Sequence, residues 1–146
     1  MGEDITSYMT ELDIENNFFI SDSIANITNE VLDVEVLKAF EKIKSDDGSD
    51  FVVELIDLYL HGTPQRIQAI RKAALEKEWV VLKLTAHTIK GSSSTLGLHR
   101  IAQVCQELEA TSLSSSDVLD GLVKALRTRF VEARGALIVE RERRLQ

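Results

Sequence analysis

Residues 80–97 read VVLKLTAHTIKGSSSTLG, and the rest of the chain is interpreted as the scaffold of this stretch. Drawn as a helix with about 100° per residue, it separates into two faces. Apolar and small residues gather on one of them, namely Leu82, Thr85, Ile89, Ser92 and Leu96, flanked by Val81, Ala86 and Ser93. A stripe of this kind packs against neighbouring helices. The stretch therefore predicts a helix with one buried side.

The opposite face of this predicted helix is centred on His87, so its imidazole is expected to point to water. Helical spacing brings further residues onto the same surface, namely Val80, Lys83, Leu84, Lys90, Gly91 and Ser94. The two lysines disfavour the protonated imidazole, and a neutral imidazole nitrogen is a nucleophile. If the ring carried a phosphoryl group, the same lysines would lie where they offset its negative charge.

A glycine within this helix needs a reason. Gly91 follows His87 by one turn and costs about 1 kcal/mol of helix propensity relative to alanine. The missing side chain leaves room beside the histidine. We interpret Gly91 as a position where the backbone or active-site rim of another protein comes close.

The run from His87 to Gly97 reads HTIKGSSSTLG. It is followed by apolar residues at helical spacing and an acidic residue, namely Leu98, Ile101, Cys105, Leu108 and Glu109. This pattern resembles the histidine-containing phosphotransfer (HPt) domain of multistep phosphorelays. The spacing H-x-x-K-G-S-x-x-x-x-G with apolar residues on both sides is specific, and the resemblance extends from about residue 32 to the end.

The resemblance implies a role for each motif residue. His87 would be the phospho-accepting residue, Lys90 its charge partner and Gly91 the clearance position. A phosphoryl group would arrive from an aspartate in the receiver domain of a hybrid histidine kinase, bond to Nε2, and leave for the receiver aspartate of a response regulator. The receiver would supply Mg²⁺, so the resemblance implies no cofactor and no metal site in this chain.

Docking of the receiver is expected around the histidine. Interfaces are apolar at the centre and polar at the rim. Val80 and Leu84 are the predicted apolar anchors, with Lys83, Lys90 and Ser94 around them.

Composition limits the alternatives. A chain of 146 residues is about one domain, and 44% hydrophobic residues with only 5% aromatics and one proline indicate an aliphatic, mostly helical core. A net charge of −7 argues against a nucleic-acid binder. The sequence has no apolar run of about 18 residues and no secretory signal. The single Cys105 cannot form an internal disulfide, and we expect it to pack in the core rather than to have a redox role. We expect a cytoplasmic monomer without membrane or nucleic-acid partners.

Further helices are predicted on both sides of the His87 stretch. Residues 32–44 and 98–111 read as short helices, and 118 onward as a long helix. Residues 51–77 read as one helix kinked at Pro64, although two helices, the second with Thr63 as N-cap, are the alternative. The apolar residues of the last helix repeat at intervals typical of a bundle, and those expected on the buried side of 51–77 are Leu55, Leu58, Tyr59, Ile67, Ile70 and Leu75. Near the end, Arg141, Arg143 and Arg144 are expected to complement the helix dipole and aid solubility.

These patterns predict an all-α fold, an antiparallel four-helix bundle with a short N-terminal covering helix, formed by residues 31–146. Residues 1–30 are an acidic extension in which Ile5, Tyr8, Met9 and Leu12 have helical spacing. The sequence leaves open whether this extension docks on the bundle or on a partner, or is a disordered tail.

Two other functions compete with that of a phosphate carrier. A helical adaptor that binds receivers without carrying phosphate has no need of a nucleophile, so His87, Lys90 and Gly91 argue against it. A phosphotransfer domain cut from a larger histidine kinase is a further alternative, although Met1 favours a stand-alone protein. Because a glycine-rich phosphate loop and metal-binding spacings such as H-E-x-x-H are absent, we expect no kinase activity.

Overall fold

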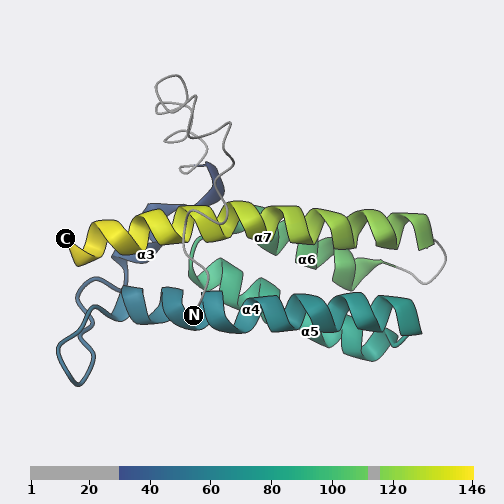
Figure 1. Cartoon of the computed structure of the whole chain (residues 1–146), viewed down its shortest axis with the longest axis horizontal. Coiled ribbons are helices and arrows are strands. Elements are labelled where there is room, and N and C mark those ends of the chain that lie inside the picture. The colour runs from purple at the N-terminus through teal and green to yellow at the C-terminus, as the bar shows by residue number, and fades with distance from the viewer. Residues whose placement is uncertain (1–29, 112–115) are drawn as a thin grey trace.

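The computed structural model describes residues 30–111 and 116–146. These residues form the helices α3 (Val34–Lys38), α4 (Phe51–Glu76), α5 (Trp79–Thr95), α6 (His99–Ala110) and α7 (Ser116–Leu145), and no strand occurs among them (Figure 1). The predicted all-α class is therefore confirmed. The alternatives for the N-terminal extension concern residues 1–29, which lie outside the described part of the chain.

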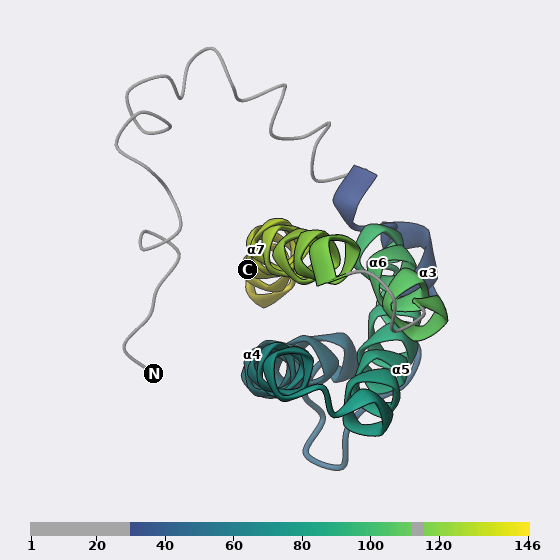
Figure 2. The same cartoon turned by 90° about the vertical axis from the view of Figure 1, so that its right-hand side faces the viewer.

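The four long helices pack in a closed order. α4 packs against α5, α5 against α6, α6 against α7, and α7 against α4, and both views show α4 and α7 side by side (Figures 1 and 2). Their shared core is aliphatic, and its largest fully buried side chains include Ile56, Ile70, Leu82, Ile89, Leu98, Ile101, Leu108, Leu126 and Leu137. Burying each such side chain stabilises the fold by about 1.5–3 kcal/mol.

Helix α4 begins at a side-chain cap. The carboxylate of Asp50 accepts hydrogen bonds from the backbone N–H groups of Val52 at 2.8 Å and Val53 at 3.3 Å, which satisfies donors that have no partner within the helix. The helix continues through Pro64 to Glu76. The prediction of one helix here, rather than two, is confirmed.

Some predicted details of the helices were wrong. The helix expected over 32–44 is only the five residues of α3, after which the chain continues in turns. Leu58 and Leu75, expected in the core, are exposed, as is Val81. Periodicity failed for these residues because single exposed apolar residues are common. The buried face of α4 includes Tyr59, Ile67 and Ile70, as predicted, and also Ile56.

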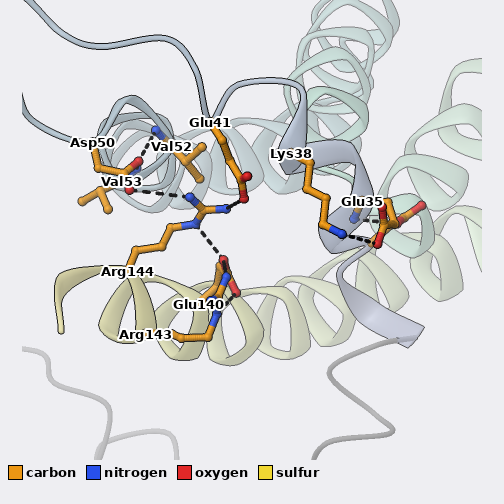
Figure 3. A network of polar contacts seen from close by, with 10 residues as sticks. Glu35, Lys38, Glu41, Asp50, Val52, Val53, Glu140, Arg143 and Arg144 are labelled. Atoms are coloured by element: carbon orange, nitrogen blue, oxygen red, sulfur yellow. Dashed lines mark hydrogen bonds and ion pairs between the residues drawn. The ribbon is translucent and has the colours of Figure 1, made fainter.

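The C-terminal arginines do more than complement the helix dipole. The side chain of Arg144 is only 9% exposed, and its guanidinium lies 2.7 Å from Glu140, 3.1 Å from Glu41 and 3.5 Å from Asp50 (Figure 3). Arg143 also contacts Glu140 at 2.6 Å. The predicted surface role was wrong for Arg144, because it ties the end of α7 to the cap of α4 and to the segment before it.

Candidate functional site

His87 lies on the outer face of α5. The buried side of this helix follows Leu82, Ala86, Ile89 and Ser93, while the side chain of His87 is 69% exposed. The predicted outward orientation is confirmed. An imidazole held in this way is accessible to a second protein.

A glycine turn leads from α5 to α6. Gly97 has φ = 80°, a conformation that costs other residues about 1–2 kcal/mol, and a Cβ at this position would lie 2.6 Å from the carbonyl oxygen of Asp33. The backbone N–H of Asp33 also donates to the carbonyl of Gly97 at 2.9 Å. The turn thus anchors the segment before α3 and sends α6 back along α5.

This hairpin brings Glu109 of α6 to the histidine. Its Oε1 lies 3.1 Å from Nδ1 of His87 and 3.1 Å from Nζ of Lys90. A carboxylate can only accept hydrogen bonds, so in the neutral imidazole the hydrogen is on Nδ1 and the lone pair is on Nε2. Nε2 is therefore the ring nitrogen available for a bond.

Sequence reasoning quoted Glu109 as part of the motif but gave it no role. The signal that could have found it is the hairpin register. His87 precedes Gly97 by ten residues and Glu109 follows it by twelve, and two helices that fold back at the glycine place such positions side by side.

The other predicted motif residues surround the ring. Lys90 is partly buried and hydrogen-bonded to Glu109. Gly91 is exposed, and a Cβ added there would meet no atom within 4 Å. Internal packing therefore does not require a glycine at this position.

All four predicted docking residues are exposed. The side chains of Val80 and Leu84 are exposed apolar groups at 73% and 64%, and Lys83 and Ser94 are also exposed. Leu84 borders an open groove of about 360 Å³ between α4 and α5, whose other walls include Gly62, Arg66, Ala69, Thr85 and Thr88. Val80 is not among the residues that line this groove.

Two ionisable side chains near the site, those of Cys105 and Tyr59, are buried, and both have raised pKa values. Burial raises the pKa of the Cys105 thiol to about 12, with the nearby charge of Glu109 adding to the effect. The thiol stays protonated near neutral pH, so the prediction of a packing cysteine is supported. Burial also raises the pKa of Tyr59, whose hydroxyl lies 2.8 Å from Oγ of Ser93 and links α4 to α5.

Within residues 30–111 and 116–146, no group of three or more His, Cys, Asp and Glu side chains could hold a metal ion.

The family comparison agrees with this geometry. The family model of the Hpt domain matches residues 54–135, more than half of the chain, and the matched range includes His87, Lys90 and Glu109. The chain belongs to the Hpt domain family. Membership of this family implies a phosphotransfer role in two-component phosphorelays and interaction with receiver domains. No curated protein matches the chain.

The described helices of this Hpt domain include none that is both long and apolar enough to span a membrane.

Proposed function

We propose that His87 of this Hpt domain accepts a phosphoryl group from a receiver aspartate of a hybrid histidine kinase and passes it to the receiver aspartate of a response regulator. One observation carries the proposal. Glu109 contacts the exposed ring through Nδ1 at 3.1 Å, which leaves Nε2 as the ring nitrogen that would act as the nucleophile.

The transfer is a displacement at phosphorus. Nε2 attacks the aspartyl phosphate, a P–N bond forms, and the P–O bond to the aspartate carboxylate breaks. The phosphorylated ring keeps its hydrogen on Nδ1 and becomes cationic, and the Glu109 carboxylate at this atom offsets that charge. The second aspartate reverses the step, and because both phosphorylated groups are high in energy, transfer can run in either direction.

Lys90 is the charge partner in this proposal. Its ammonium group lies 3.1 Å from Glu109, which holds it on the His87 side of α5, where it offsets the charge of the phosphoryl oxygens. Mg²⁺ would come from the receiver. The chain then acts as a carrier without kinase activity of its own, in keeping with the absence of a nucleotide-binding loop.

The receiver would dock over the exposed face of α5. Val80 and Leu84 would form the apolar centre, with Lys83 and Ser94 around it, and Gly91 would give the partner clearance beside the histidine. We also propose that α4 to α7 form an antiparallel four-helix bundle. Their closed packing order and the short connections between α4, α5 and α6 support it. The monomeric state and cytoplasmic location stay predictions.

Phosphorylation by a receiver tests the proposal. The purified chain is mixed with a phosphorylated receiver domain, and acid-labile, base-stable phosphate is measured on it. We expect label on the wild type and on His61→Gln, a matched change at another exposed histidine, but none on His87→Gln. Label on His87→Gln would assign the phosphate to another residue. No label on any chain across several receivers would favour the adaptor.

The role of Glu109 has its own test. A hydrogen bond to a charged group is worth about 1.5–3 kcal/mol, so Glu109→Ala is expected to slow transfer by about tenfold or more. Glu109→Gln keeps an acceptor oxygen and should retain more activity. Nitrogen NMR of the His87 ring should show loss of the Nδ1–H preference in Glu109→Ala alone. Unchanged ring signals and transfer in this variant would remove Glu109 from the mechanism.

A further inference from the structure

A second groove lies on the α4–α7 side of the bundle, where the two helices run side by side (Figures 1 and 2). This α4–α7 groove has a volume of about 180 Å³, and its walls include Pro64, Ile67, Arg71, Arg127, Phe130 and Val131. Ile67 and Phe130 belong to the core, whereas Val131 is exposed. The groove therefore has an apolar floor and cationic edges.

The cations along this groove are not neutralised by the bundle. Arg71, Lys124 and Arg127 have no ion-pair partner within residues 30–111 and 116–146, and Lys124 lies with Arg127 and Val131 around an adjoining hollow. By contrast, Arg141 and Arg144 are paired with carboxylates. Three unpaired cations in a chain of net charge −7 fit an acidic ligand with an apolar side.

The chain itself supplies a segment of that chemistry. Residues 1–29 contain no lysine, arginine or histidine, and they carry six carboxylates, at Glu3, Asp4, Glu11, Asp13, Glu15 and Asp22. Within the same segment Ile5, Tyr8, Met9 and Leu12 recur at helical spacing and Phe18, Phe19 and Ile20 follow. This is the charge and apolar content that the α4–α7 groove would accept.

The segment is tethered close to the groove. Its next residue, Glu30, lies 3.6 Å from Arg100, which lies 3.6 Å from Glu132 of α7. Arg127 precedes Glu132 by five residues, about 8 Å along a helix about 10 Å wide. The ten residues from Ser21 to Glu30 can span up to about 33 Å, which is enough to pass around α7. A short tether of this kind gives an effective concentration in the millimolar range.

We propose that residues 3–20 dock in the α4–α7 groove of the same chain. Their apolar side chains would cover Ile67, Phe130 and Val131, and their carboxylates would pair with the groove cations. His87 lies on the outer face of α5, which is across the bundle from α7 (Figure 2), so docking leaves the histidine accessible. The extension would then shield an apolar and cationic surface without competing with receivers.

Paramagnetic broadening in the full chain tests this proposal. A nitroxide is attached at Ser7→Cys, and Cys105 is fully buried, so labelling of the unsubstituted chain serves as the blank. We expect amide signals around Arg71 and Arg127 to broaden strongly and those on the outer face of α5 to stay sharp. The double change Arg71→Glu and Arg127→Glu should abolish this pattern, and adding Glu11→Lys and Asp13→Lys should restore it at least in part.

A matched control changes the same charge elsewhere. The control is Arg66→Glu with Lys77→Glu, which reverses two exposed cations in and directly after α4. Neither residue lines the α4–α7 groove, so the broadening around Arg71 and Arg127 should persist. Equal broadening on all faces would overturn the proposal. So would broadening that is unchanged in the variant with Arg71→Glu and Arg127→Glu. So would broadening that appears only between different copies, as measured by mixing spin-labelled unenriched chain with unlabelled ¹⁵N chain, because the occupant would then be a second molecule.

Discussion

Replacing Gly91 with alanine should make this Hpt domain more stable and less active. Gly91 is an exposed residue inside α5, and an added Cβ meets no atom within 4 Å, so the full propensity gain of about 1 kcal/mol is expected. An unfolding entropy of about 2.1 cal/mol/K per residue over 146 residues gives about 0.3 kcal/mol/K. The melting temperature should therefore rise by about 3 °C.

Transfer should fall in the same variant, because the new methyl group enters the space that the receiver is proposed to fill. Overpacking a closely fitted contact costs about 1–3 kcal/mol, which corresponds to a loss of transfer rate of about 5-fold to 150-fold. The assay is the rate of label transfer from a phosphorylated receiver, measured beside thermal unfolding. Gly121→Ala is the matched control, since Gly121 is an exposed glycine of α7 with no atom within 4 Å of an added Cβ.

The two glycine variants separate the effects. Gly121→Ala should gain similar stability and transfer normally. If Gly91→Ala also transferred at the wild-type rate, the clearance role of Gly91 would be refuted. If Gly91→Ala had a lower melting temperature than the wild type, the conclusion that an added Cβ meets no other atom would be refuted instead.

Three further predictions follow from the structure. Leu84→Asp should slow transfer about tenfold with little change in melting temperature, because Leu84 is 64% exposed and a desolvated charge weakens an apolar contact; normal transfer would remove Leu84 from the interface. Gly97→Ala should lower the free energy of unfolding by more than about 2 kcal/mol in denaturant titrations, since φ is 80° and the Cβ would lie 2.6 Å from a backbone oxygen; wild-type stability would contradict the turn geometry. Burial raises the pKa of Glu140, but hydrogen bonds from Arg143 and Arg144 outweigh it and the net pKa is lowered. Its stabilisation is therefore present above about pH 4.3 and lost as the pH falls through the folded value, so Glu140→Gln should be less stable than the wild type by about 3 kcal/mol at pH 7 and approach it in acid. A difference that does not shrink in acid would contradict the ion network.

Prediction from the sequence succeeded where a local pattern carries the information. The periodicity around His87 sets which face of α5 is buried, and this depends only on the angle between successive helical residues. Pro64 did not split its helix, and Cys105 lies in the core as expected. Patterns failed for Leu58 and Leu75, because an apolar residue at the edge of a helical stripe can lie on either side of it.

Tertiary contacts determine the positions of Glu109 and Arg144, which helical periodicity cannot predict. Glu109 is 22 residues from His87 in the chain, and only the return of α6 at Gly97 brings its carboxylate to the ring at 3.1 Å. Arg144 reads as a surface cation at a helix end, yet packing places it over the cap of α4. The face of α5 on which His87 lies could be predicted from the sequence alone, because a helix repeats every few residues. The contact between Glu109 and His87 and the buried ion network depend on contacts between distant segments, which only the packed helices establish.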